Sequence, residues 1–138
     1  MLARAVLDPG VLVAALLSRE GAPARLVTAW FDGSFEIVTS PALLAELARV
    51  LERPKFRPYV SADEARRYVR LFARGGLLFD DPPTAPWVPA DPGDDYLVCL
   101  AKAARTNALV SGDAHLLALV DLEPPVMTPR AFLERVER

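Results

Sequence analysis

The chain has 138 residues, which is long enough to bury a hydrophobic core but short for two domains, so we expect one domain spanning residues 1–138. Hydrophobic residues make up 52% of the chain and charged residues 25%, which is typical of a globular protein and argues against disorder. The single cysteine, Cys99, excludes an internal disulfide and a cysteine-based zinc site, and its apolar surroundings predict a buried side chain.

The N-terminal region is apolar, but its pattern fits neither a membrane span nor a signal peptide. Charged side chains interrupt it, so no apolar run approaches the roughly 18 residues that a spanning helix needs. Asp8, Pro9 and Gly10 also break what would be the apolar stretch of a signal peptide. We therefore expect a cytoplasmic protein.

Strand and helix patterns alternate along the first half of the chain. Short aliphatic runs bounded by Pro or Gly predict strands at residues 3–8 and 35–40. Helical periodicity predicts helices at residues 11–20, 23–33, 41–53 and 61–76. Ser40 is suited to be an N-cap, Ser61 forms a capping box with Glu64, and Gly33 is suited to end a helix.

The same alternation continues in the second half. Residues 80–93 contain five prolines, which predict an extended loop without regular structure. Strands are predicted at residues 77–79 and 108–112, with a last fragment just before Thr128, and helices at residues 94–106, 113–119 and from Thr128 onward. Alternating strands and helices favour an α/β fold in which helices cover both faces of a parallel sheet.

Carboxylates fall at the ends of these predicted strands and helices. Asp8 closes the first strand and Asp113 follows the strand at 108–112, so a parallel sheet would bring both to its carboxyl edge, where open α/β folds bind ligands. Asp94 and Asp95 open a helix, with Asp91 just upstream. Helix capping is the simpler interpretation of any one of these three residues. A cluster of them would instead select a hard cation such as Mg²⁺ or Mn²⁺, which would offset their mutual repulsion.

Glu46 occupies an unusual position in the helix predicted at residues 41–53. It lies on the same side as the apolar stripe, where an unpaired charge is costly to bury. One interpretation is an ion pair with Arg49 or Arg53, and the other is that Glu46 points at Asp8 and the other acids.

Three segments, in this order and spacing, resemble the PIN-domain family: "AVLDPGVLVAALLS", "SPALLAELARVL" and "DPGDDYLVCLAKAARTNALVSGD". The likeness is to its bacterial branch of toxins from toxin–antitoxin pairs. It covers nearly the whole chain. The resemblance implies a three-layer α/β/α sandwich with a central parallel sheet, and a ribonuclease that uses Mg²⁺ or Mn²⁺ to cut RNA. It also implies a small antitoxin and a second copy of the chain as partners.

The resemblance also implies site residues. The catalytic and metal-binding acids would be Asp8, Glu46, Asp95 and Asp113, with Asp94 competing with Asp95 for the third position and Asp91 capping the loop. Ser40 and Ser111 either support the site or act only as caps and turn residues. Because metal ions lower the pKa of water, this chemistry needs no nucleophilic side chain. His115 is either a phosphate contact or an exposed residue at a helix start.

One position departs from the family pattern. Members usually carry Asn two residues after the first aspartate, where this chain has Gly10; a backbone N–H or a water could replace the amide. A PIN-like module that binds RNA or protein without cleaving is therefore the alternative function. A receiver-type phosphotransfer domain is disfavoured, because neither lysine, Lys55 or Lys102, ends a strand.

The basic residues are unevenly distributed, although the net charge is −2. Half of the 16 basic residues lie between Arg49 and Arg74. Since an acidic site repels RNA, we expect a separate cationic surface to hold it, formed by Arg53, Lys55, Arg57, Arg66, Arg67, Arg70 and Arg74. A solvated helix face and a docking surface for an acidic antitoxin are the alternatives. Tyr59 and Tyr68 lie nearby, and Phe72 is assigned to the core.

Overall fold

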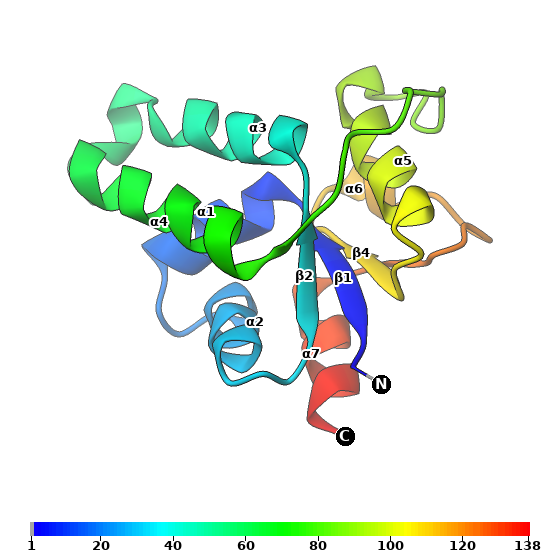
Figure 1. Cartoon of the computed structure of the whole chain (residues 1–138), viewed down its shortest axis with the longest axis horizontal. Coiled ribbons are helices and arrows are strands. Elements are labelled where there is room, and N and C mark those ends of the chain that lie inside the picture. The colour runs from blue at the N-terminus through cyan, green and yellow to red at the C-terminus, as the bar shows by residue number, and fades with distance from the viewer. Residues whose placement is uncertain (1) are drawn as a thin grey trace.

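The computed structural model describes residues 2–138, in which five parallel strands form a sheet flanked by helices (Figure 1). The strands are β1 (Arg4–Leu7), β2 (Glu36–Thr39), β3 (Leu77–Leu78), β4 (Ala108–Val110) and β5 (Val126–Met127). The helices are α1 (Pro9–Leu17), α2 (Ala22–Phe31), α3 (Pro41–Leu51), α4 (Ala62–Gly75), α5 (Asp95–Ala103), α6 (Ala114–Leu117) and α7 (Pro129–Glu137), with 3₁₀ turns η1 (Pro54–Phe56) and η2 (Pro92–Asp94). The predicted α/β sandwich with a central parallel sheet is confirmed.

The strand order is β3-β2-β1-β4-β5, so β1 lies at the centre of the sheet. Ala5, Val6 and Leu7 of β1 are fully buried, as expected of a central parallel strand that is covered on both faces. Helix α5 packs on β1 and β4, α4 packs on β2, and α7 packs on β4. The parallel sheet explains the continuous apolar runs by which its strands were predicted.

The aromatic residues of the core join the helices to one another. Phe35, which precedes β2, meets Phe132 of α7 edge to face at 5.1 Å. Phe72 of α4 is fully buried and stacks on Trp30 of α2 at 5.1 Å, so its prediction as a core residue is confirmed. Tyr68 donates its hydroxyl hydrogen bond to the backbone carbonyl of Leu12 at 2.6 Å, which gives it a structural role between α4 and α1. Buried Cys99 is also confirmed.

The helix starts differ from the sequence-based prediction by two residues at most, and α1 and α5 show why. Helix α1 begins at Pro9, two residues early, because Asp8 is its N-cap and Pro9 is suited to the first helical position. Helix α5 begins at Asp95, because residues 92–94 form the 3₁₀ turn η2. Within residues 2–138, none of the helices combines the length and the apolar character that crossing a lipid bilayer requires.

Candidate functional site

The site lies where the order of the strands reverses. The chain passes outward from β1 through β2 to β3, and then returns to the other side of β1 to form β4 and β5. Leu7, the last residue of β1, pairs with Val110, the last residue of β4, so Asp8 and Ser111 emerge side by side at the carboxyl edge. In open α/β sheets, this reversal point is where ligands bind.

A short network joins Asp8 to the turn after β4. Asp8 Oδ2 accepts a hydrogen bond from the Ser111 hydroxyl at 2.7 Å, and Asp8 Oδ1 accepts one from the Gly10 N–H at 2.9 Å. The Ser111 hydroxyl in turn accepts from the Asp113 N–H at 2.9 Å. Because Ser111 is fully buried, this network fixes the carboxylate of Asp8 relative to the loop that carries Asp113.

Asp94 is electrostatically coupled to three other carboxylates. Its pKa is raised from 3.8 to about 6, first because partial burial disfavours the charged form and then because Asp8, Asp91 and Asp113 repel it. His115 opposes this shift. Although Asp94 occupies the N-cap position of α5, its side chain makes no capping hydrogen bond. The capping interpretation therefore does not account for Asp94, which belongs to an acidic cluster.

Asp91, Asp113 and His115 also converge. One side-chain ligand atom from each of them lies within 4.8 Å of the other two, close enough for the three to contact one ion. Asp91 also accepts a hydrogen bond from the Gly93 N–H at 3.1 Å, which is the loop-capping role expected of it. The family resemblance gave Asp91 the capping role, whereas the structure brings it to the acidic cluster as well. The side chain of His115 is exposed, with Nδ1 3.7 Å from Asp113 Oδ1.

Asp95 has different surroundings from those of Asp94. Only 7% of its surface is exposed, and its Oδ1 accepts hydrogen bonds from the backbone N–H groups of Trp87 at 2.9 Å and Val88 at 2.7 Å. It is not among the charges that raise the pKa of Asp94. The structure therefore gives Asp95 a contact that anchors the proline-rich loop, and brings Asp94 to Asp8 and Asp113.

Glu46 forms an ion pair with Arg49, one turn further along α3. This is the first of the two interpretations that the sequence left open. Arg49 is close enough to Tyr96 of α5 to lower the pKa of its hydroxyl, while Asp8 and Asp94 raise it. Arg49, Asp8 and Asp94 therefore all lie near Tyr96, and Glu46 is paired with the guanidinium of Arg49 on the α3 side of this group.

Tyr96 is a residue that the sequence analysis missed. Within residues 2–138, its buried hydroxyl has no hydrogen-bond partner. Burial raises its pKa above the usual range, and the negative charges of Asp8 and Asp94 raise it further, so the phenol remains protonated at neutral pH. A free hydrogen-bond donor thus lies near the carboxylates. The one sequence feature that could have pointed to Tyr96 as a site residue is its position directly after Asp94 and Asp95.

Ser40 and Gly10 have clear local roles. Ser40 is fully buried and its hydroxyl accepts from the Leu43 N–H at 3.2 Å, which makes it the N-cap of α3. Ser111, by contrast, contacts Asp8 directly. The backbone N–H of Gly10 donates to Asp8, and it is one of the two replacements for the family's amide that the sequence analysis named.

The predicted cationic surface divides into different environments. Arg66 pairs with Asp63, Arg57 donates to the backbone carbonyl of Leu51, and Lys55 lies over the ring of Phe56. Arg53 is exposed. The remaining arginines of α4 are exposed and line a common pocket: Arg67, Arg70 and Arg74.

The sequence and the fold are similar to those of known proteins. The profile of the PIN-domain family matches residues 4–115. The chain belongs to the PIN-domain family. This PIN domain is 24% identical to the uncharacterized protein MJ1680 of Methanocaldococcus jannaschii over 98% of this chain and 92% of that protein. The crystal structure of PAE2754 from Pyrobaculum aerophilum has the same fold, with a TM-score of 0.70 and 17% identity over 98% of this chain and 90% of that one.

The donor atoms of this PIN domain fit a hard divalent cation. PIN domains are generally nucleases and usually use divalent metals. Here the available ligands are carboxylate oxygens with one imidazole, a set that suits Mg²⁺ or Mn²⁺. His115 lowers the pKa of Asp94, but it does not offset burial and the three neighbouring carboxylates, which raise that pKa. A hollow of about 360 Å³ lined by Asp8, Gly10 and Asp113 gives access beside it.

Proposed function

We propose that this PIN domain is a divalent-metal-dependent endoribonuclease that hydrolyses RNA phosphodiester bonds. The observation that carries the proposal is the acidic cluster at the strand-order reversal, where Asp91, Asp113 and His115 converge and where burial, and then Asp8, Asp91 and Asp113, raise the pKa of Asp94. Such a cluster costs free energy in the metal-free protein, and a hard cation would offset that cost.

In this proposal Asp8, Asp94 and Asp113 hold Mg²⁺ or Mn²⁺, with Asp91 and His115 beside Asp113. Ser111 orients Asp8, and Asp95 fixes the loop at Trp87 and Val88. Glu46, which the family resemblance placed among the ligands, is paired with Arg49 through one of its two carboxylate oxygens and stands outside this ligand set.

The chemistry follows from the charges of the site. A divalent ion, when bound, lowers the pKa of water and stabilises negative charge on the phosphate, and the products would carry 5′ phosphate and 3′ hydroxyl ends. The protonated hydroxyl of Tyr96 provides a hydrogen-bond donor in the same neighbourhood. No side chain needs to act as a nucleophile.

The test is cleavage of labelled single-stranded RNA with Mn²⁺ and with EDTA. Asp8→Asn should abolish Mn²⁺-dependent cleavage, while Asp32→Asn, an equal charge change at the exposed C-cap of α2, should preserve it. Cleavage that survives EDTA or the Asp8 substitution would contradict the proposal. Binding of RNA without cleavage under any divalent ion would favour the alternative, a non-cleaving binding module, for which Gly10 is the supporting observation.

We also propose that the domain is the toxin of a toxin–antitoxin pair, with a small antitoxin and a second copy of the chain as partners. The support is the resemblance to the toxin branch of the family. Induced expression should arrest growth of a bacterial host, and Asp8→Asn should relieve the arrest. A short acidic or DNA-binding protein encoded in the adjacent reading frame should also restore growth when it is co-expressed. Normal growth with an active nuclease would contradict the toxin role alone.

A further inference from the structure

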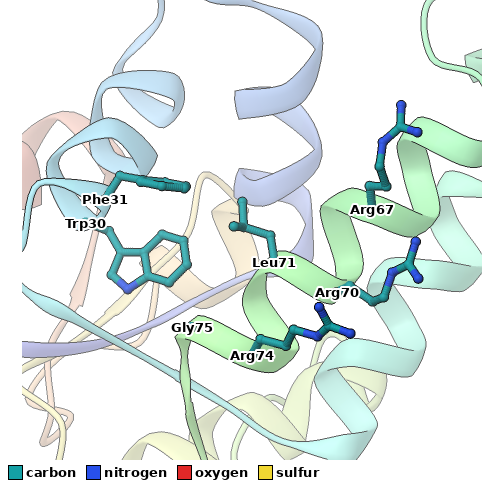
Figure 2. Close-up of a pocket in the computed structure, with 7 residues that line it drawn as sticks. All are labelled: Trp30, Phe31, Arg67, Arg70, Leu71, Arg74 and Gly75. Atoms are coloured by element: carbon teal, nitrogen blue, oxygen red, sulfur yellow. The ribbon is translucent and has the colours of Figure 1, made fainter.

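A second concave surface lies between α2 and the last turns of α4. It encloses about 710 Å³ and is lined by Trp30, Phe31, Arg67, Arg70, Leu71, Arg74 and Gly75. Figure 2 shows the two aromatic rings of α2 on one side of Leu71 and the three guanidinium groups of α4 on the other. We name this surface the α2–α4 pocket. None of its residues belongs to the carboxylate site.

The aromatic side of the α2–α4 pocket is exposed yet firmly supported. Phe31 is 65% exposed, which is unusual for so large an apolar side chain, and its ring meets that of Trp30 at 5.6 Å. Trp30 stacks on the buried ring of Phe72. Its indole also lies flush against Gly75, where an added Cβ would come within 2.9 Å of the indole. The pocket therefore offers a preformed aromatic platform to a ligand.

The cationic side consists of Arg67, Arg70 and Arg74. Their spacing of three and four residues places them on one face of α4, and all three are exposed. Within residues 2–138, none of the three has a carboxylate within salt-bridge distance, whereas the adjacent Arg66 pairs with Asp63. Three unpaired guanidinium groups in a row repel one another, so a bound polyanion would relieve that repulsion.

The two sides together match one kind of ligand. An unpaired nucleotide has a flat base that stacks on aromatic rings and a phosphate that guanidinium groups bind. A double helix keeps its bases stacked inside, and an acidic peptide would use the arginines but not the rings. We propose that the α2–α4 pocket binds an unpaired segment of single-stranded RNA, with a base on Phe31 and phosphates along the three arginines. The pocket extends the proposed nuclease function, because it would hold the RNA that the acidic site repels.

The test is a binding titration without any divalent ion. The two tryptophans of the chain are Trp30 and Trp87, so a Trp87→Phe background leaves Trp30 as the fluorescent reporter; the substitution preserves the backbone N–H that contacts Asp95. Adding a short oligouridylate RNA in EDTA should quench Trp30. Duplex RNA and poly-glutamate should quench it much less at equal ionic strength. Because EDTA prevents metal-dependent cleavage, this titration measures binding alone. RNA that binds in EDTA and is not cleaved when Mn²⁺ replaces the EDTA would contradict the proposed nuclease and leave this pocket supported.

Matched variants distinguish RNA binding in the α2–α4 pocket from nonspecific attraction of RNA to the positive charge of α4. Phe31→Ala should weaken oligouridylate binding about tenfold, whereas Tyr59→Ala, an exposed aromatic outside the pocket, should not. Arg67→Gln should reduce the slope of log affinity against log salt concentration by about 0.7. Arg66→Gln, at the preceding residue, should leave that slope nearly unchanged, because Arg66 is paired with Asp63. Equal effects of Arg66→Gln and Arg67→Gln would overturn the proposal. So would poly-glutamate binding that matches RNA and is insensitive to Phe31→Ala, which would instead assign the surface to an acidic protein.

Discussion

Ser111 connects Asp8 to the turn that carries Asp113. Its hydroxyl donates to Asp8 Oδ2 at 2.7 Å and accepts from the Asp113 N–H at 2.9 Å. A single buried side chain therefore holds the carboxylate of Asp8 and the backbone of Asp113, which come from neighbouring strands. Asp8 follows β1 and Asp113 follows β4. The Ser111 hydroxyl connects the two, so their relative position depends on it.

Ser111→Ala should weaken both metal binding and cleavage. The substitution leaves Asp8 Oδ2 and the Asp113 N–H without their common partner, and losing an outer contact of this kind costs about 10- to 100-fold in metal affinity or activity. Mn²⁺ affinity measured by calorimetry, and cleavage of labelled RNA, should both fall within that range.

Ser40→Ala is the matched control for Ser111→Ala. Ser40 is also fully buried and also follows a strand, but its hydroxyl caps α3 by accepting from the Leu43 N–H. Its loss should lower the free energy of unfolding by about 1 kcal/mol and leave Mn²⁺ affinity unchanged. If the two variants lose Mn²⁺ affinity equally, general destabilisation rather than orientation of Asp8 is responsible.

Asp94 and Asp95 should respond differently to the same change. Asp94→Asn removes a carboxylate from the acidic cluster and should reduce Mn²⁺-dependent cleavage by at least about a hundredfold, the upper end of what an outer contact costs. Asp95→Asn keeps an acceptor oxygen for the N–H groups of Trp87 and Val88, so cleavage should fall by less than about tenfold. Rates measured with both purified variants check this assignment, and the reverse order would place Asp95 in the ligand set.

Asp94 should also make the metal-free protein depend on pH in a defined direction. Its folded-state pKa of about 6 exceeds its ordinary value of 3.8, so between these values the folded state holds a proton that the unfolded state releases. The free energy of unfolding should therefore fall as pH rises through this window. In EDTA, Asp94→Asn should be more stable than the unaltered protein by about 1 kcal/mol at neutral pH, a value reduced for solvent screening.

Urea unfolding across a pH series measures this difference. Well below pH 3.8 it should disappear, because Asp94 is then protonated in both states. Asp32→Asn, the same charge change at an exposed position, is the matched control. A stability difference that stays constant from acid to neutral pH would show that the substitution acts through packing and not through charge.

Tyr96→Phe should stabilise the protein and impair cleavage. The hydroxyl of Tyr96 is buried without a partner within residues 2–138, and leaving a polar group unsatisfied costs about 1 to 3 kcal/mol. Its removal should therefore raise the free energy of unfolding, as measured in urea. If the hydroxyl donates to bound RNA or to a site carboxylate during turnover, cleavage should fall about tenfold while stability rises. A variant that is more stable and equally active would limit Tyr96 to a packing role.

The sequence predicted the strands and helices because each carries a local signal. Continuous apolar runs marked the central strands, and Ser40 and Ser61 marked helix starts that the structure confirms. The start of α5 was misplaced, because the 3₁₀ turn at residues 92–94 has the same polar, proline-containing composition as a loop. Helix boundaries depend on such turns, which periodicity does not distinguish.

The candidate site was predictable only in part. Asp8 and Asp113 follow directly from strand ends in a parallel sheet. The choice between Asp94 and Asp95 does not follow, because adjacent helical residues point about 100° apart and either could face the site. The N–H groups that bind Asp95 belong to the loop at Trp87 and Val88, whose position depends on tertiary packing and not on a local sequence pattern. The partner of Glu46 is undetermined for a similar reason: its place on the apolar side of α3 fits both interpretations.

Gly10→Asn tests whether the departure from the family pattern costs activity. The Gly10 N–H already donates to Asp8 Oδ1 at 2.9 Å, and an added Cβ would meet only that oxygen, at an ordinary contact distance of 3.6 Å. An asparagine can therefore be accommodated while the backbone hydrogen bond remains. We expect the unaltered protein and Gly10→Asn to cleave RNA at rates within about tenfold of each other, because the added amide duplicates a contact that Asp8 already has. Cleavage that appears only in Gly10→Asn would show instead that the natural chain is a non-cleaving PIN domain whose Asp8 lacks an essential partner.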